Sequence, residues 1–367
     1  MMRKLIIVLI LCIISLTSIS TLPVNAQKPN GSEYKIYQFP NDKIPRLDGD
    51  LSDWSEVPES YIIDTSHLFD SEEGNGFNIP RNDLDVRVIV AWNDSTNRVY
   101  FMVKQYDDFH NFNRPNLAEI QGDDIFEVVI DADHSEGLCF TDATKWKEGH
   151  EKLQSVTAQN YHTFIPPRQG ILIWIWGIPR WLENKPYSDG YCKYDGQHGS
   201  SGWLNLEWYI TPYDYASHLG PKFSAVHDLE EGDLMGLSFC FIDWDASDEQ
   251  YDGFYNLAHD TKFIFDAGFL QDFRLMPVEG FSPETPKANF DFELDRNPPD
   301  KERSRIVKFI NKSTGNIEEY YWDFGDGTFS KEKEPTHDYL AMTHPNVVLT
   351  VKGPRGEHKK LKVVRTY

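Results

Sequence analysis

Paired carboxylates are the first residues of this sequence that could do chemistry. Asp131 and Asp133 form one pair with a single residue between them, and Asp243 and Asp245 form a second pair with the same spacing. Carboxylate oxygens are the hard ligands that Ca²⁺ prefers, so these pairs could hold a structural calcium ion. Neither run has the Asp-x-Asp-x-Asn-Gly loop of a specific calcium site. A solvated or backbone-capping role therefore stays open for all four side chains.

Glu127 is a single carboxylate on a strand face that is otherwise apolar. Alternation through residues 125–131 places it on the same side as Ile125 and Val129. Acidic side chains are rarely buried unless they are paired. Glu127 is therefore either a ligand contact or a member of an internal hydrogen-bond network, and the sequence leaves both interpretations open.

Catalytic signatures are absent from the sequence. It has no Gly-x-Ser-x-Gly turn, no His-Glu-x-x-His helix and no clustered Cys or His with metal-ligand spacing. A glycosidase needs two carboxylates ~5 to ~9.5 Å apart. Because the chain has 58 acidic residues, some pair would meet that distance by chance, and none is nominated. We therefore predict that the protein is not an enzyme.

The net charge of −22 limits the classes of partner. Such a field repels phosphate backbones and sulfated glycans, and no basic cluster interrupts it. Nucleic acid is therefore a poor candidate. Neutral polysaccharides or oligosaccharides, cations and other proteins remain possible partners.

The first 26 residues have the layout of a secretory signal peptide. Arg3 and Lys4 precede an apolar run, and small residues lead up to Ala26, after which we expect cleavage. That run is too short to span a membrane, and no later segment offers ~18 consecutive apolar residues. The mature protein is expected to be secreted or held at the cell surface.

Three cysteines, Cys139, Cys192 and Cys240, follow the signal segment at wide spacing. An odd number at such spacing is no disulfide framework, so at most one bond can form. Buried apolar filling is the ordinary role of free cysteine, and the hydrophobic core must hold the fold.

The elements that would position these residues are strands. Residues 85–105 alternate as a hairpin around the turn at 93–97, and 125–131 form the next strand. Further strands are expected at 159–164, 171–176, 204–210, 235–242 and 262–265. Short strands separated by Gly, Asn and Pro predict an all-β protein built from β-sandwiches.

Four tryptophans raise the question of exposed rings. Residues 171–176 are apolar on both faces, which is typical of a buried strand, but Trp174 and Trp176 could instead form an exposed aromatic platform. Trp181 and Trp203 lie in polar, loop-like sequence and are the better candidates for exposed rings.

A proline-rich run between Met276 and Lys287 divides the chain. We expect a first sandwich at 27–276, a stiff linker at 277–286 and a second unit at 287–367. In the second unit, Trp322 and Phe324 share one strand face, and Gly325 and Gly327 permit a tight turn. The run WDFGDG at 322–327, the stretch His337-Asp338-Tyr339 and the strand VVLTV at 347–351 resemble the PKD domain.

The PKD resemblance implies a small Ig-like sandwich without catalytic machinery. Such a unit would act as a spacer or as a contact module for other extracellular proteins. It often occurs in proteins that process polysaccharides.

Four stretches of the first unit, in order, carry a second resemblance. They are 47–54 (LDGDLSDW), 88–108, 122–133 (GDDIFEVVIDAD) and 235–245 (MGLSFCFIDWD). Together they resemble the family 9 carbohydrate-binding modules and their DOMON-like relatives. This resemblance implies a β-sandwich and, in some relatives, structural calcium.

Sugar-binding members of that family stack a sugar ring between two Trp and bind its hydroxyls with Glu, Gln and Arg. The resemblance places the glutamate at Glu127 and the glutamine at Gln159, and the arginine position falls near Tyr161 or His162. Neither Trp is where the family has it. The rings that could replace them are Phe112, Phe254 and Tyr255.

We therefore predict a secreted, non-catalytic carbohydrate-binding protein that takes a neutral glycan on its first unit. The alternatives are an extracellular interaction or scaffold protein with a degenerate sugar site and, third, a carbohydrate-active enzyme. The missing Trp rings favour the scaffold, and the missing catalytic motifs disfavour the enzyme.

Overall fold

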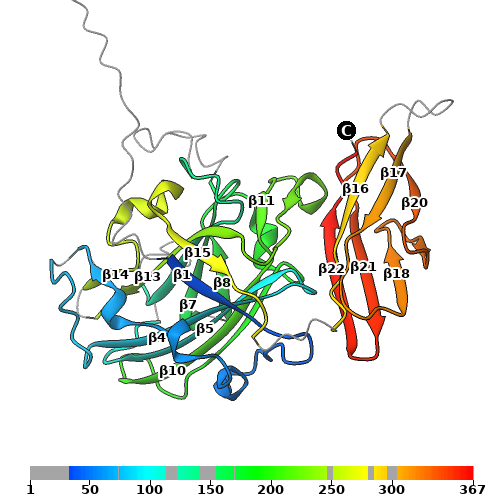
Figure 1. Cartoon of the computed structure of the whole chain (residues 1–367). Coiled ribbons are helices and arrows are strands. Elements are labelled where there is room, and N and C mark those ends of the chain that lie inside the picture. Colours follow the sequence, from blue (N-terminus) through cyan, green and yellow to red (C-terminus); the bar gives the residue numbers. More distant parts are fainter. Residues whose placement is uncertain are drawn as a thin grey trace, which may run out of the picture.

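Two β-sandwich units follow each other along the chain in this computed structural model (Figure 1). It describes residues 33–72, 74–112, 122–139, 154–168, 170–245, 251–279, 285–295 and 304–366. Their regular elements are β-strands and short 3₁₀ helices, which confirms the all-β prediction. None of the helices found there is long and apolar enough to cross a membrane. The expected signal peptide at 1–26 and part of the expected linker at 277–286 lie outside the described residues.

The large unit contains the following strands and 3₁₀ helices. The strands are β1 (Glu33–Gln38), β2 (Ile63–Asp64), β3 (Phe69–Asp70), β4 (Leu84–Asn93), β5 (Arg98–Asp107), β6 (Ile125–Asp131), β7 (Gln159–Arg168), β8 (Ile171–Ile175), β9 (Ser188–Lys193), β10 (Gly202–Ile210), β11 (Tyr213–Tyr215), β12 (Ala225–Val226), β13 (Leu234–Asp243), β14 (Gly253–Asn256) and β15 (Gln271–Leu275). The 3₁₀ helices are η2 (Leu51–Trp54), η3 (Glu59–Tyr61), η4 (Thr65–His67), η6 (Arg180–Glu183), η7 (Pro221–Phe223), η8 (Thr261–Ile264) and η9 (Ala267–Phe269).

Strand β1 joins two sheets into one sandwich. The strand order is β8-β7-β6-β13-β15-β1-β4-β5-β10-β9. The first part of β1 pairs with β15, and its last two residues, Tyr37 and Gln38, pair with β4. A strand that changes sheets in this way closes the corner of a sandwich. The main core fills the space between the sheets and includes Trp92, Phe126 and Trp208, all fully buried.

The predicted hairpin at 85–105 is confirmed as β4 and β5, which pair in unbroken register from Leu84–Asp107 to Asn93–Arg98. The strand predicted at 262–265 is wrong, because this segment forms η8. The Asp260 side chain accepts a hydrogen bond from the Lys262 backbone N–H and so caps a helical turn. This turn places Phe263 in a second, smaller hydrophobic core.

The small unit is a two-sheet sandwich. Its strands are β16 (Phe290–Asp295), β17 (Ser304–Asn311), β18 (Glu319–Asp323), β19 (Phe329–Ser330), β20 (Thr336–Leu340), β21 (Asn346–Gly353) and β22 (Gly356–Val363). One sheet runs β16-β17-β20 and the other β19-β18-β21-β22. Trp322 is fully buried between them and donates from Nε1 to the Glu332 carbonyl oxygen at 2.9 Å.

The three cysteines behave as apolar filling. Cys139, Cys192 and Cys240 are all free thiols, and Cys139 and Cys240 are buried. Burial raises the pKa of Cys139 to about 12, which leaves the thiol protonated.

Candidate functional site

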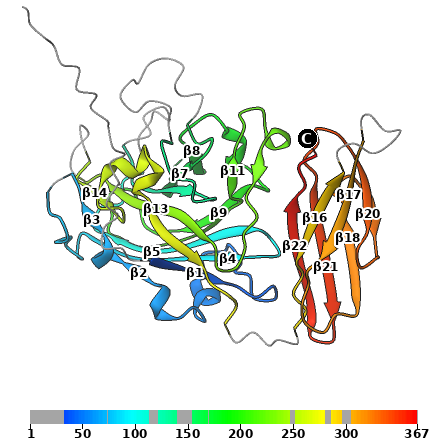
Figure 2. The same cartoon turned by 45° about the horizontal axis from the view of Figure 1, so that its top comes forward.

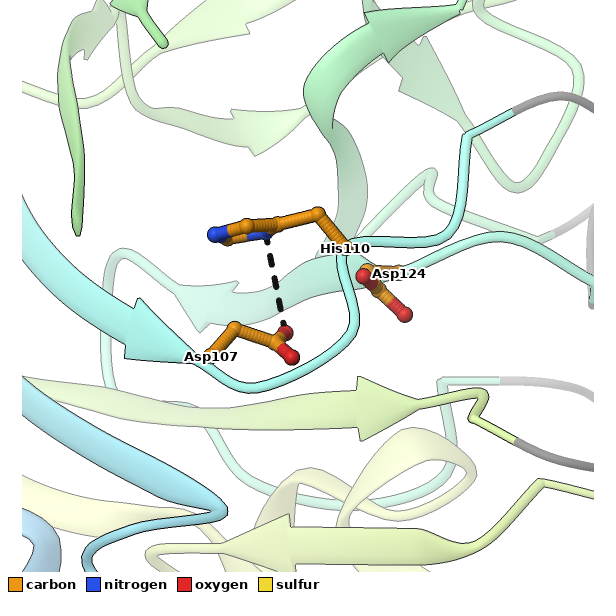
Figure 3. A group of neighbouring side chains, drawn as sticks. All are labelled: Asp107, His110 and Asp124. Carbon is orange, nitrogen blue, oxygen red and sulfur yellow. Dashed lines mark ion pairs between the residues drawn. The ribbon is translucent and has the colours of Figure 1, made fainter. Parts of the chain in front are cut away.

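An acidic centre lies at one end of the large sandwich, where strands of both sheets terminate. Asp107 ends β5, Asp124 precedes β6, and Asp243 and Asp245 lie at the end of β13. Figure 3 shows Asp107, His110 and Asp124 as neighbours, with the His110 ring over the Asp107 carboxylate, and one ligand atom of each lies within 4.8 Å of the others. The ligand atoms of Asp107, Asp243 and Asp245 also lie within 4.8 Å of one another. Asp83, Asp108 and Asp245 form a third such group.

Burial gives this centre unusual electrostatics. Asp107, Asp124 and Asp243 are 2–3% exposed. Burial raises the pKa of Asp124 and of Asp243 well above the ordinary value, and the neighbouring Asp107 charge adds to both shifts. Burial and the Asp107 charge raise the pKa of Asp245 to about 7. Several buried carboxylates cannot all be ionised without a compensating positive charge.

Two of these carboxylates are well supplied with hydrogen bonds. Asp124 accepts from the Asn111 backbone N–H at 2.6 Å and from the Trp244 backbone N–H at 3.1 Å. Asp107 accepts from the Phe109 backbone N–H at 2.8 Å and from Gln105 Nε2 at 3.1 Å.

Three other polar atoms of the centre have no hydrogen-bond partner. Two are carboxylate oxygens, Asp243 Oδ1 and Asp245 Oδ1. The third is Nδ1 of the fully buried His110, which lies 3.7 Å from Asp107 Oδ2. A positive charge at this place would satisfy all three, and the converging oxygen ligands suit a hard divalent cation.

The four carboxylates expected to bind metal do not meet. Asp243 and Asp245 belong to the acidic centre, whereas Asp131 lies at the other end of the antiparallel pair, opposite Gly236. Asp131 accepts hydrogen bonds from Ser135 Oγ and the Glu136 backbone N–H, and burial raises its pKa to about 6. Asp133 accepts from the Ser135 backbone N–H. These two residues therefore take the backbone-capping role that the sequence left open.

The residues expected to contact a sugar lie on two opposite sheet faces. Cross-strand register puts Trp174, His162, Glu127 and Cys240 in one row on the face that carries the second core. Gln159 is opposite Ile130 and therefore points the other way, into the main core with Tyr161 and Tyr255. The structure thus separates Gln159 and Tyr161 from Glu127 by the thickness of the sheet.

Glu127 is held by neighbouring side chains. Its carboxylate accepts from Asn160 Nδ2 at 2.7 Å and from Cys240 Sγ at 3.4 Å, and His162 Nε2 lies 3.5 Å away. The Glu127 side chain is only 2% exposed. Burial lowers the pKa of His162, which favours its neutral form. Glu127 is therefore a member of an internal hydrogen-bond network, which is one of the two interpretations that its sequence position left open.

Two half-buried indoles, which pack against the second core, cover the edge of this network. Trp174 and Trp176 lie edge-on to the His162 ring, with centroids 5.3 and 6.0 Å away. His162 Nδ1 and Asn160 Oδ1, beside these indoles, are buried and have no hydrogen-bond partner. We call the surface formed by Trp174, Trp176 and Arg180 the indole face. The Arg180 guanidinium lies over the Trp174 ring at 4.9 Å.

The three substitute rings lie apart from this surface. Phe254 is buried in the second core, and Tyr255 is buried in the main core and donates to Asp83 at 3.2 Å. Phe112 packs edge-on to His198 and Tyr194. Their positions do not surround Glu127 as a pair of stacking rings would.

The two tryptophans from loop-like sequence differ in exposure. Trp203 is 48% exposed, as expected, and lies beside Tyr106 and Lys104. Trp181 is half-buried and donates from Nε1 to the Ser217 carbonyl oxygen at 2.8 Å.

Comparison with a family model confirms the resemblance of the second unit to the PKD domain. Residues 285–366 match the sequence model of the PKD domain. The PKD1 domain of the Vibrio cholerae metalloprotease PrtV is 32% identical, and the match covers 22% of this chain and 99% of that one, with a TM-score of 0.18. The PKD1 domain of Vibrio anguillarum Epp is 27% identical over 23% of this chain and 100% of that one, with a TM-score of 0.19.

The longer match is to a family 9 carbohydrate-binding module from Caldicellulosiruptor kristjanssonii, solved in complex with cellotriose. It is 11% identical, covers 68% of this chain and 96% of that one, and has a TM-score of 0.42. No curated protein matches this chain significantly.

Proposed function

We propose that this protein is a secreted, non-catalytic glycan-binding protein whose large unit holds a neutral saccharide at the indole face. The observation that supports this proposal is the pair of partly exposed indoles, Trp174 and Trp176, with the exposed Arg180 guanidinium over the Trp174 ring. A sugar ring offers an apolar C–H face for an indole and hydroxyls for a guanidinium. Glu127 acts from beneath by orienting Asn160 and His162.

The location of the glycan follows from exposure. Glu127, Gln159, Asn160, His162, Phe254 and Tyr255 are buried, so a sugar cannot reach them directly in this structure. The partly exposed indoles of Trp174 and Trp176 and the exposed Arg180 are the groups that a sugar can reach. A neutral ligand also suits a strongly acidic chain, because it meets no electrostatic repulsion.

The test is calorimetric titration of the full chain with cello-oligosaccharides, followed by a glycan array. The Caldicellulosiruptor module was solved with cellotriose, which makes these the first ligands to try. Trp174→Ala or Trp176→Ala should raise the Kd about tenfold or more. A tenfold change corresponds to a loss of ~1.4 kcal/mol of binding free energy. The control is Trp203→Ala, which removes an exposed indole from a different surface. If no glycan binds, or if only the control variant loses binding, the proposal fails and the scaffold alternative gains.

We propose in addition that the acidic centre holds a calcium ion. The donor atoms suit Ca²⁺, because Asp107, Asp243 and Asp245 each offer one carboxylate oxygen to the same place. One carboxylate oxygen of Asp243, Oδ1, is buried and has no hydrogen-bond partner. The ion would neutralise the buried carboxylates and tie the end of β5 in one sheet to the end of β13 in the other. Its expected effect is a rise in melting temperature on adding Ca²⁺, measured against EGTA, and an unchanged melting temperature would contradict it.

A further inference from the structure

The last strand of the small unit directs alternate side chains toward the large unit. In β22, His358, Lys360 and Lys362 pair in register with Val351, Leu349 and Val347, which belong to the core of the small unit. Because β22 is the edge strand of its sheet, these three side chains extend past that core. Figures 1 and 2 both show β22 as the strand of the small unit that lies beside the large one.

Lys360 is at the centre of the contact. Its ammonium group donates to the Leu229 carbonyl oxygen at 2.8 Å and to Asp94 Oδ1 at 3.2 Å, and lies 3.3 Å from Asp228 Oδ1. The side chain is only 4% exposed. Burial alone would lower the pKa of Lys360, but the Asp94 and Asp228 charges outweigh burial and raise it, so the lysine stays charged.

Lys362 and His358, which lie on the same face of β22 as Lys360, also contact carboxylates of the large unit. Lys362 Nζ lies 2.6 Å from Glu230 Oε1 and 3.7 Å from Asp228 Oδ2. His358 accepts at Nδ1 from the Ala288 backbone N–H, so its Nε2 carries a proton toward Asp94 Oδ2 at 3.3 Å. Arg365 pairs with Asp214, and Lys287 with Glu231, at the margins of the contact.

The backbone edge of β22 is also covered by the large unit. Ser95 Oγ accepts from the Lys359 backbone N–H and donates to the Lys359 carbonyl oxygen, both at 3.3 Å. Asn41 Nδ2 donates to the Glu357 carbonyl oxygen at 3.4 Å. An uncovered edge strand would expose these groups to pairing with another chain.

Charge is divided between the two parts of the sequence in a complementary way. Residues 287–367 contain 15 Lys and Arg and 13 Asp and Glu, a net charge of +2, whereas residues 1–286 carry −24. We define the acidic rim as the five carboxylates of the large unit that meet the small one. They are Asp94, Asp214, Asp228, Glu230 and Glu231.

We propose that β22 is an intramolecular docking strand whose partner is the acidic rim, and that this contact holds the two units at one fixed angle in solution. On this view, residues 277–286 join two docked bodies and do not act as a spacer. The docked strand is also withheld from strand addition by other proteins, so an outside partner of the small unit must use its other faces.

The test uses charge reversal and rescue on the full chain at low salt. Lys362→Glu places a carboxylate against Glu230 and should open the contact, while Lys362→Glu combined with Glu230→Lys restores the opposite charges and should close it. Lys359→Glu is the matched control, because Lys359 neighbours Lys360 on β22 but its side chain belongs to the opposite face, where it pairs with Glu357.

Small-angle X-ray scattering and the rate of proteolytic cleavage between Met276 and Lys287 report the state of the contact. We expect one compact shape for the wild type and for the control. Lys362→Glu should give a larger radius of gyration and cleavage about tenfold faster, because cleavage follows the open population. The charge-swapped double variant should return to wild-type values. A wild type that scatters as a flexible ensemble at low salt, or a Lys362→Glu variant as compact and as resistant as wild type, would overturn the proposal.

Discussion

His110 Nε2 lies 3.0 Å from the carbonyl oxygen of Gly202, and this contact sets the chemistry of the acidic centre. A carbonyl oxygen can only accept, so Nε2 carries the ring proton and a neutral His110 presents the bare lone pair of Nδ1. That lone pair faces Asp107 Oδ2 at 3.7 Å. Two electron-rich atoms are stable so close together if one of them carries a proton or if a cation lies beside them. A histidine that binds a metal through one ring nitrogen commonly donates from the other to a backbone carbonyl oxygen.

The pH dependence of stability should report this centre when no cation is bound. In the unfolded chain Asp245 titrates near 3.8, whereas in the folded protein its pKa is about 7, and Asp124 and Asp243 shift the same way. Between these pH values the folded state binds more protons than the unfolded state, so the free energy of unfolding falls as the pH rises. In EGTA the melting temperature should therefore be higher at pH 5 than at pH 7.5. Saturating Ca²⁺ at pH 7.5 should remove most of the difference, and equal melting temperatures in EGTA would contradict the prediction.

Asp243→Asn should have opposite effects with and without calcium. Without the ion, the neutral amide removes one charge from a repelling group, so the melting temperature in EGTA should rise. With the ion, one ligand is weakened, so the stabilisation by added Ca²⁺ should shrink or vanish. A purely structural role for Asp243 would lower stability in both conditions, which is the outcome that would refute a cation site.

Asp133→Asn is the control for that experiment. Asp133 lies at the other end of β6, and its contact is with the Ser135 backbone N–H, which an amide oxygen can also accept. Its response to calcium should match that of the wild type.

The sequence predicted those parts of the fold that depend on local alternation. The hairpin at 84–107 has period-two apolar residues on both strands and was located almost to the residue. Strand β1 was not predicted, because its role depends on changing from β15 to β4 at Tyr37, a tertiary event without a local signal. At 261–264, capping by Asp260 overrode an apolar spacing that resembled a strand.

The candidate sites show the same limit. Asp243 and Asp245 were identified as possible ligands, but their companions Asp107 and Asp124 depend on which strand ends meet. The runs Asp107-Asp108 and Asp123-Asp124, at a strand end and a strand start, were the available signal. Matching Gln159 to the family's glutamine fixed its strand but not its face, and in a strand a shift of one residue reverses the face.

Glu207→Gln should test how the segment before η2 is anchored to the large sheet. The fully buried Glu207 carboxylate accepts from Trp54 Nε1 at 2.8 Å, from the Gly49 backbone N–H at 2.7 Å and from the Asp48 backbone N–H at 3.1 Å. An amide cannot accept at its nitrogen, so at least one buried donor loses its partner. We expect the free energy of unfolding in urea to fall by about 2 kcal/mol.

Glu319→Gln is the matched control for that substitution, because this exposed strand carboxylate should change stability by less than about 0.5 kcal/mol. Equal effects of the two variants would show that Glu207 does not anchor the segment.

Two glycines of one turn in the small unit should differ in their tolerance of alanine. Both have a left-handed backbone, with φ of 75° at Gly325 and 90° at Gly327. A Cβ at Gly325 would lie 2.4 Å from the Asn346 carbonyl oxygen, which is backbone and cannot move aside easily, whereas a Cβ at Gly327 meets nothing within 4 Å. Gly327→Ala should therefore cost about 1 kcal/mol, from backbone strain alone. Gly325→Ala should cost more than about 2 kcal/mol, because the clash adds to the same strain. Urea unfolding of both variants measures the difference. Equal losses of stability would mean that the left-handed backbone of the turn, and not the contact with Asn346, is the reason for glycine at position 325.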